Sequence, residues 1–183
     1  LQDHPSVALR YRNDGLPSST LTAHRAGGVQ IIQTVVGDEM WVVPALMRPT
    51  SNGVIGANDS GEIEAQFRLC QNAGDQELLL AAVTKVAADH ARREGIDVPR
   101  PGREGEWLMD RLASTTPVYS HATGGCCMGE VTDRLGRVKG IENLFVADSS
   151  VFPAIPSVNP MIPTVQLAET LSDRWRDAGL VSG

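Results

Sequence analysis

The apolar residues early in the chain fall into short β-branched runs that are separated by polar turns. Residues 28–36 read GVQIIQTVV and predict a strand, because β-branched residues fit a pleated, half-buried surface. The Gly-Asp pair at 37–38 predicts a turn, and residues 40–47 predict a second strand. Pro44 lies inside that second run, and a proline there favours an edge strand or a bulge.

Weaker apolar runs surround these two strands. Residues 53–57 and 63–70 predict two further short strands. Residues 1–27, rich in Pro, Ser and Asn, predict irregular structure with one apolar patch at 7–9. Neighbouring strands joined by short polar loops are typical of an antiparallel sheet, which we therefore expect in this part of the chain.

A helical period marks residues 75–93, where three apolar residues share one stripe and Asp75 is placed to cap the start. The stripe residues are Leu79, Val83 and Val86. His90 continues the stripe, and we interpret it as a half-buried helix residue rather than as a ligand. A Pro- and Gly-rich connector over 95–105 and a short helix over 106–113 are predicted to follow.

The last third of the chain contains a hairpin signal, an apolar run and a helix. Residues 131–138 predict the hairpin, and residues 144–147 predict a strand that ends at Asp148. Asn159-Pro160 predicts a helix start, because Asn is a favoured N-cap and Pro is favoured at the first helical position. Four residues at helical spacing follow before a C-terminal stop at a glycine: Val165, Ala168, Leu171, Trp175 and then Gly179.

The start of this last helix is a candidate binding feature. Its first N–H groups have no intrahelical acceptor, and the helix dipole adds a partial positive charge. That combination suits an anion, or a group that becomes anionic during a reaction. On the local pattern alone, an ordinary capped helix is the simpler interpretation.

Composition and charge narrow the class of protein. The 183 residues are 42% hydrophobic and 21% charged, which is typical of a soluble globular protein of one or two domains. The net charge of −6 disfavours nucleic acid and an anionic membrane surface as partners. No apolar run approaches the ~20 residues that a membrane-spanning helix needs. We therefore expect no nucleic-acid partner and no membrane partner.

The cysteines argue against a disulfide framework. Cys70, Cys126 and Cys127 are odd in number and two of them are adjacent, which is more typical of a reducing compartment, so we predict a cytoplasmic protein. His121 lies close to the adjacent pair in sequence, but the spacing is wrong for a tetrahedral zinc site. No metal site is predicted.

Several pieces of the C-terminal third resemble the C-terminal signature of the glucose–methanol–choline (GMC) flavoprotein oxidoreductases, in order and in spacing. They are His121–Cys126 (HATGGC), Gly136–Gly140, Asn143–Ser150, Pro153 and Asn159-Pro160. The Gly-Gly-Cys version is similar to the one in bacterial cholesterol oxidase. Residues 1–5 and the loop at 49–53 also resemble pieces of this family, so the resemblance spans nearly the whole chain.

The resemblance implies an α+β fold with two domains. Residues 1–118 would form a substrate-binding domain, an antiparallel sheet with helices. Residues 119–183 would form an active-site segment whose strand and helix complete an FAD-binding domain. The family binds FAD through a G-x-G-x-x-G turn, and neither Gly27-Gly28 nor Gly124-Gly125 has that spacing. We therefore expect a C-terminal portion that works with an N-terminal FAD-binding polypeptide, either a cleaved half or a separate subunit, and the start at Leu1 rather than Met suggests a fragment.

The resemblance also assigns chemistry to individual residues. Oxidation of an alcohol needs a base for the hydroxyl proton, and imidazole serves near neutral pH. The resemblance places His121 at the flavin ring as that base and Asn159 as the group that holds the substrate oxygen. Taken alone, His121 would more simply be a structural histidine beside a tight turn.

Cofactor contacts follow from the same resemblance. It implies that the last helix stabilises the reduced flavin through its N-terminus. The predicted FAD contacts are Ala147, Asp148, Asn159, Pro160 and Met161. Without the family context, Asp148 would equally well be a loop-start carboxylate that makes local turn bonds.

The predicted function is therefore oxidation of a small-molecule alcohol, with His121 removing the proton and FAD accepting the hydride. Two alternatives stay open: a redox-silent lyase relative, or a non-catalytic partner subunit of the same fold. The sequence does not choose among sugar, sterol, aryl alcohol and polyol as substrate, or between oxidase and dehydrogenase.

Overall fold

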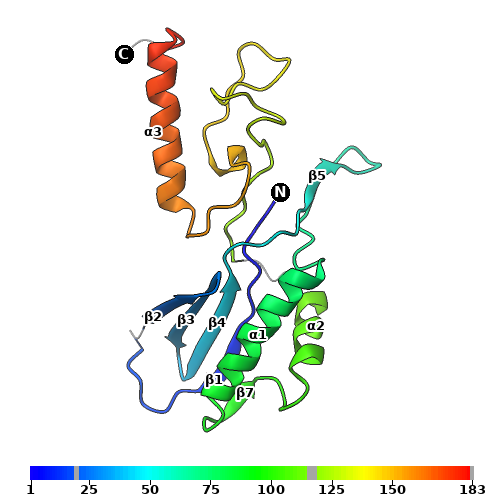
Figure 1. The fold of residues 1–183 in the computed structure, drawn as a ribbon, viewed down its shortest axis with the longest axis vertical. Coiled ribbons are helices and arrows are strands. Elements are labelled where there is room, and N and C mark those ends of the chain that lie inside the picture. The colour runs from blue at the N-terminus through cyan, green and yellow to red at the C-terminus, as the bar shows by residue number, and fades with distance from the viewer. Residues whose placement is uncertain (19–20, 115–118, 182–183) are drawn as a thin grey trace. The chain divides into compact units, whose positions relative to one another are not determined.

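The computed structural model describes residues 1–18, 21–114 and 119–181, and the chain divides into two compact units (Figure 1). The sheet unit comprises His4–Ser51 and Leu69–Tyr119, and the loop unit comprises Leu1–Asp3, Asn52–Arg68 and Ser120–Gly183. These units differ from the predicted division into 1–118 and 119–183, because two earlier pieces of chain join the C-terminal segment. The predicted boundary itself adjoins residues 115–118, which lie outside the described residues.

The sheet unit is built on five antiparallel strands in the order β2-β3-β4-β1-β7 (Figure 1). The strands are β1 (Leu9–Arg12), β2 (Leu21–Ala26), β3 (Val29–Val36), β4 (Glu39–Leu46) and β7 (Gly95–Asp97). The predicted antiparallel sheet and α+β class are confirmed, and β3 and β4 match the two strands expected from their β-branched runs.

The prediction of irregular structure over residues 1–27 was wrong, because this region contains the strands β1 and β2. Every residue of β2 is exposed, and its sequence, LTAHRA, alternates apolar and polar positions only over its first four residues. It is a strand because it pairs along its whole length with β3. Tertiary pairing of this kind leaves no local signal in the sequence.

The prediction of an edge position or a bulge at Pro44 was also wrong, because β4 is an inner strand between β3 and β1. In an antiparallel strand, the N and the carbonyl oxygen of one residue point to the same side. The carbonyl of Pro44 accepts a hydrogen bond from the N–H of Val7 at 3.3 Å, so the missing proline donor faces residues 5–7. Pairing is already irregular there, before β1 begins at Leu9. The proline therefore removes no regular ladder bond.

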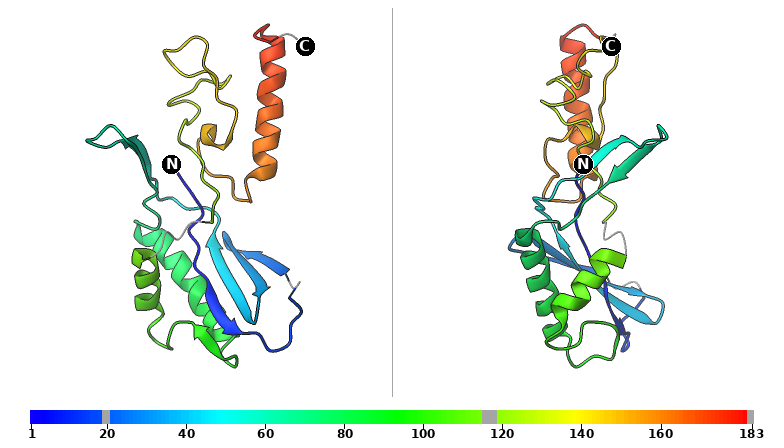
Figure 2. Two further views of the ribbon diagram at one scale, coloured as in Figure 1. Left: turned by 180° about the vertical axis from the view of Figure 1, so that it is seen from behind. Right: turned by 90° about the vertical axis from the view of Figure 1, so that its right-hand side faces the viewer.

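Two helices complete the sheet unit. α1 (Ala73–Asp89) lies across the sheet over β4 and β1, and α2 (Glu104–Ser114) lies beside α1 (Figures 1 and 2). The buried core between them and the sheet contains the whole predicted stripe of α1: Val7, Leu9, Tyr11, Met40, Val42, Cys70, Leu79, Val83, Val86 and Leu108. His90 is half-buried as predicted, directly after α1, and its ring lies 5.3 Å from that of Tyr11.

The start of α1 differs from the prediction. Asn72, not Asp75, is the N-cap, and its side chain accepts the N–H of Asp75 at 2.8 Å. The buried carboxylate of Asp75 instead accepts the N–H groups of Thr50 at 3.0 Å and Ser51 at 2.8 Å. Burial alone would raise the pKa of Asp75, but the hydrogen bonds from Thr50 and Ser51 outweigh it and lower the pKa below its usual range.

The loop unit contains little regular structure. It holds a hairpin of β5 (Val54–Ala57) and β6 (Ile63–Gln66), a short 3₁₀ helix, η1 (Ser149–Val151), and α3 (Met161–Asp177). The predicted strand at 144–147 was wrong: Phe145 makes one isolated bridge with Arg137. The predicted hairpin at 131–138 is present as a turn closed by a bridge between Thr132 and Val138.

Within the loop unit, α3 runs beside these loops and is fixed to them near its C-terminus (Figure 2). The indole N–H of Trp175 donates to the carbonyl of Leu135 at 2.7 Å, and its ring packs edge-on against Phe145 at 5.5 Å. In the same loops Gly136 permits a close approach of the Val146 carbonyl, because it has φ +72° and any Cβ would overlap that oxygen. Gly179, also at positive φ, follows α3 as predicted.

No helix in the described part of the chain is long and apolar enough to cross a membrane.

Candidate active site

The candidate base, His121, lies at the start of a tight loop and is half-buried. The preceding residue, Ser120, has φ +62°, a left-handed conformation that costs a non-glycine residue about 1–3 kcal/mol. The backbone N–H of His121 donates to both carboxylate oxygens of Asp3 at 3.1 Å. The turn at Ser120 directs the N–H of His121 toward Asp3. The charge-assisted bonds that result offset part of the backbone strain.

The loop after His121 is held by backbone hydrogen bonds on two sides. Gln2 and Thr123 exchange both backbone hydrogen bonds, at 2.8 and 2.9 Å. The N–H groups of Gly124 and Cys126 donate to the carbonyls of η1, to Ser149 at 3.2 Å and to Ser150 at 2.9 Å. The conformation of the loop is therefore fixed by segments that are distant in sequence.

The structure brings the two predicted catalytic residues together. The side-chain nitrogen of Asn159, Nδ2, lies 3.5 Å from Nε2 of His121, although the residues are 38 positions apart in sequence. At that distance the contact is at the long limit of a hydrogen bond, with the amide donating to a neutral imidazole. His121 is half-buried and Asn159 is exposed, so the pair can be reached by a small molecule.

Burial and charge act on His121 in opposite directions. Desolvation lowers the pKa of His121, and the negative charge of Asp3 partly opposes it. The net direction is downward, so the imidazole is neutral at neutral pH and has a lone pair for a proton. This is the protonation state that a general base requires.

The start of α3 departs from the prediction in one respect. The N-cap is Pro160 rather than Asn159, and no described side chain caps the helix. The side-chain nitrogen of Asn159 contacts His121, and its side chain makes no cap hydrogen bond to α3. The prediction that Asn159 caps α3 was therefore wrong.

The groups at the start of α3 fit a flavin. The first N–H groups of an uncapped helix have no intrahelical acceptor and carry a partial positive charge. The side chains of Met161 and Ile162, in the first turn of α3, are 73% and 67% exposed. Exposed apolar side chains beside backbone donors suit a planar aromatic ring that becomes anionic at one edge.

Ala147 and Asp148 lie directly before η1, at the start of the segment that leads to α3. Ala147 is half-buried, and Asp148 is exposed and caps η1 by accepting the N–H of Ser150 at 2.8 Å. This local bond is the turn interaction expected of a loop-start carboxylate. Contact of either residue with FAD stays a prediction.

Sequence reasoning missed Asp3 and Gln2 as parts of this site. Asp3 is 118 positions from His121, and no pattern within residues 1–5 points to a distant backbone partner. The side chain of Gln2 accepts the N–H of Ile155 at 2.7 Å. The one available signal was that residues 1–5 resembled a family segment, which assigned them no contact.

The adjacent cysteines make local contacts. Cys126 and Cys127 are both free and half-buried, and the thiol of Cys127 donates to the carbonyl of Gly124 at 3.1 Å. Among the described residues, no group of three His, Cys, Asp or Glu side chains is arranged to hold a metal ion.

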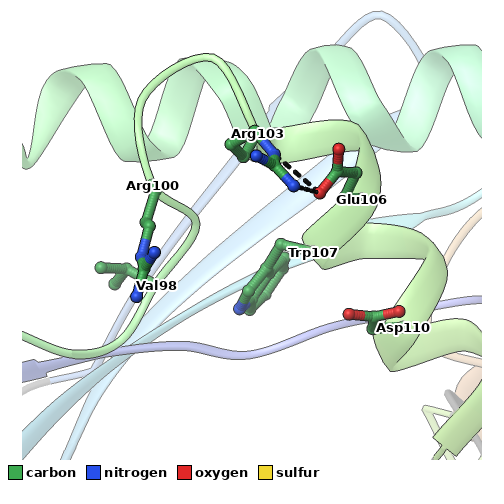
Figure 3. Close-up of a pocket in the computed structure, with 6 residues that line it drawn as sticks. All are labelled: Val98, Arg100, Arg103, Glu106, Trp107 and Asp110. Carbon is green, nitrogen blue, oxygen red and sulfur yellow. Dashed lines mark hydrogen bonds and ion pairs between the residues drawn. The ribbon is translucent and has the colours of Figure 1, made fainter.

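The sheet unit has a separate concavity beside α2, of about 270 Å³ (Figure 3). Its lining residues are Val98, Arg100, Arg103, Glu106, Trp107 and Asp110. Arg103 and Glu106 form an ion pair across one side, and the indole of Trp107 donates to Asp97 at 3.3 Å. None of the predicted site residues lines it, and its paired charges have local structural roles.

Comparisons with known proteins identify the family of the chain. A family profile described as GMC oxidoreductase matches residues 49–168. An oxygen-dependent choline dehydrogenase from Chromohalobacter salexigens is 52% identical over 99 residues, covering 51% of this chain and 18% of that protein. A 5-(hydroxymethyl)furfural oxidase from Methylovorus sp. is 41% identical over 156 residues, covering 69% of this chain and 29% of that protein.

The solved structures show the same fold. Pyridoxine 4-oxidase from Mesorbium loti superposes with a TM-score of 0.73 at 20% identity, covering 96% of this chain and 43% of that chain. The chain spans less than a third of the length of the choline dehydrogenase and of the hydroxymethylfurfural oxidase. On the match to residues 49–168, the chain belongs to the GMC oxidoreductases, a family of FAD-dependent flavoproteins.

Proposed function

We propose that this chain supplies the catalytic part of an FAD-dependent enzyme that oxidises the CH–OH group of a small alcohol. The observation that carries the proposal is the convergence of His121 Nε2 and Asn159 Nδ2 at 3.5 Å from two distant segments. The relatives support the reaction class, since their names include a choline dehydrogenase and a hydroxymethylfurfural oxidase.

His121 is the general base in this proposal. Its neutral imidazole accepts the hydroxyl proton of the alcohol, and positioned bases of this kind contribute about 10²–10⁴-fold to rate. The lowered pKa of His121, caused by desolvation and opposed by Asp3, keeps the ring in the accepting form at neutral pH. FAD, when bound, accepts the hydride that leaves the carbon.

Asn159 orients the substrate. Its amide is neutral at every physiological pH, so it donates a hydrogen bond to the alcohol oxygen without competing with His121 for the proton. The flavin would be held beside this pair by the uncapped start of α3, from Pro160 and Met161, and by Ala147 and Asp148.

The proposal includes an N-terminal FAD-binding polypeptide, either a cleaved half or a separate subunit. No G-x-G-x-x-G turn is present in this sequence, and that turn is the family's grip on the dinucleotide. In the loop unit, Met161, Ile162 and Val165 lie exposed along the first two turns of α3, where a soluble helix normally buries its apolar residues. A covering polypeptide would bury them. We also place the protein in the cytoplasm, where three free cysteines stay reduced.

The test is to coexpress the chain with a polypeptide that carries the G-x-G-x-x-G half, and to purify the assembly and the chain alone. We expect the assembly to retain the visible flavin absorption and the chain alone to retain little. Under anaerobic conditions, addition of small alcohols such as choline should bleach the flavin of the assembly.

Three outcomes would contradict parts of this proposal. Stoichiometric, stable FAD in the chain alone would remove the need for a second polypeptide. A flavin that stays oxidised with every alcohol, while a substrate is still converted, would favour the redox-silent lyase alternative. Bound FAD with no conversion at all would favour a non-catalytic subunit.

A further inference from the structure

The first three residues of the chain hold the candidate site together at several points. Leu1 accepts the N–H of Gly53 at 2.7 Å, and Gln2 pairs with Thr123 through both backbone bonds. The carboxylate of Asp3 accepts the N–H of His121. We define Leu1–Asp3 as the N-terminal strap.

We propose that Asp3 is a positioning residue for His121: its buried carboxylate fixes the backbone of the base and supplies the negative charge that faces it. This inference rests on the proposed function, in which His121 is the base. Asp3 acts through His121 and is not itself placed on the substrate.

Burial makes the bonds of Asp3 specific. The residue is 1% exposed, so its carboxylate is removed from water and depends on hydrogen-bond donors in the protein. Two oxygens at 3.1 Å from one N–H hold His121 in a defined orientation. Loss of an acceptor at such a position leaves a buried donor unpaired, which is the more expensive half of a hydrogen bond to remove.

The strap also contacts the loop that leads to Asn159. The side chain of Gln2 accepts the N–H of Ile155 at 2.7 Å, in the loop that leads to Asn159. Thr123, paired with the backbone of Gln2, belongs to the loop that begins at His121. One short segment therefore sets both loops, and a displacement of about 1 Å in such a geometry can lower a rate about 100-fold.

Charge gives Asp3 a second effect that a purely structural residue would lack. A carboxylate favours the protonated imidazolium, and the charge of Asp3 raises the pKa of His121 against the larger, opposite effect of desolvation. Asn159, which contacts His121, carries no charge. Tyr119, two residues before His121 in the chain, has its pKa raised by burial and stays neutral. The electrostatic balance at His121 is thus set by burial against Asp3.

The experiment compares Asp3→Asn with Asp133→Asn in the assembled, FAD-loaded protein. Asparagine keeps an oxygen that accepts the N–H of His121 but removes the charge. Asp133 is a matched control in the same unit: it also accepts backbone N–H groups, from Leu135 at 2.8 Å and Arg137 at 3.0 Å. Histidine-selective NMR gives the titration of His121, assigned by its loss in His121→Ala, and stopped-flow absorbance gives flavin reduction against pH.

We expect Asp3→Asn to move the His121 titration to lower pH, together with the acid limb of flavin reduction, while Asp133→Asn moves neither. A His121 titration that is the same in wild type, Asp3→Asn and Asp133→Asn would overturn the inference. If Asp3→Asn does not fold, Asp3→Glu replaces it. Asp3→Glu keeps the charge but displaces it, so flavin reduction should fall about 10- to 100-fold with the titration near that of wild type. Unchanged flavin reduction in Asp3→Glu would overturn the positioning role.

The two readouts separate this inference from the proposed function. The NMR titration measures the effect of Asp3 on His121 whether or not His121 takes part in chemistry. A shifted titration combined with normal flavin reduction in His121→Ala would leave the coupling intact and refute the catalytic assignment.

Discussion

The sheet unit and the loop unit are stabilised by different means. In the sheet unit, apolar side chains of α1 pack on the strands, and most of the buried apolar residues of the described chain lie there. In the loop unit, the buried apolar residues among those described are Val151, Ile155 and Leu171. Its loops are held instead by backbone hydrogen bonds between distant segments and by the buried carboxylate of Asp3.

The difference bears on the proposed partner polypeptide. Hydrophobic burial is the dominant favourable term in folding, and the sheet unit has an internal core that supplies it. The loop unit leaves Met161, Ile162 and Val165 exposed on α3, together with Ile63 on β6 and Leu144. If the proposed FAD-binding polypeptide covers the loop unit, we expect it to bury these side chains. The candidate site and the exposed apolar side chains of α3 belong to the same unit.

The largest expected effect is in the core of the sheet unit. Leu79→Ala should lower the free energy of unfolding by about 2–5 kcal/mol, because Leu79 is fully buried in α1 against the sheet. Its neighbour Leu78, 46% exposed on the same helix, is the matched control, and Leu78→Ala should change stability little. Urea unfolding measures both. Equal losses in the two variants would contradict the assignment of this core.

A smaller loss is expected from the polar anchor of the same unit. Asp75→Asn should lower stability at neutral pH by about 1–3 kcal/mol, because the amide cannot accept all the donors from Thr50 and Ser51. Since folding lowers the pKa of Asp75, its stabilisation is complete above the unfolded value of about 3.9 and is lost as pH falls through the folded value. Unfolding measured from neutral to acidic pH should therefore fall more steeply in wild type than in Asp75→Asn. Parallel curves would refute this role.

In the loop unit, the largest loss of stability is expected at the close backbone contact between Gly136 and Val146. Gly136→Ala should lower stability by about 1–3 kcal/mol, because alanine is strained at φ +72° and its Cβ would overlap the carbonyl oxygen of Val146. Gly140→Ala is the control. Gly140 has φ +83° with no described atom near its Cβ position, so alanine there introduces backbone strain without overlap. Thermal unfolding of the assembly should show the larger loss for Gly136→Ala, and the opposite order would rule out the close approach.

The smallest effect is expected at the strained residue before the base. Ser120→Gly should stabilise the fold by less than about 1 kcal/mol, because relief of the left-handed strain at φ +62° is offset by the greater freedom of glycine in the unfolded chain. Thermal unfolding measures this change. A destabilisation greater than about 1 kcal/mol would show that the Ser120 side chain has a structural role of its own.

The two units also differ in what the sequence could predict. In the sheet unit, β3 and β4 were identified because β-branched runs carry a local signal, and α1 because its apolar stripe has the helical period. β2 was missed because its exposed residues alternate only over the first four positions, although it pairs fully with β3. Local patterns therefore predicted the elements that pack in the core, but not β2, which is a strand because it pairs with β3.

In the loop unit, the candidate residues came from a family resemblance rather than from any periodic pattern. His121 and Asn159 lie 3.5 Å apart, but this proximity depends on tertiary structure that neither local segment encodes. The cap at Asn159 was misjudged because the local preference of asparagine for the N-cap does not decide where a helix begins, and α3 begins one residue later with Pro160 as its N-cap. Asp3 was not identified, since a bond across 118 positions leaves no trace in spacing.

The most direct test of the central claim is anaerobic flavin reduction in the assembled protein with His121→Ala. The account predicts an alcohol-driven reduction rate at least about 100-fold below wild type, with FAD content unchanged, because the variant loses its general base. His24→Ala, at an exposed histidine on β2, is the control and should reduce at the wild-type rate. Near-normal flavin reduction in His121→Ala would contradict the claim that this imidazole removes the proton of the alcohol.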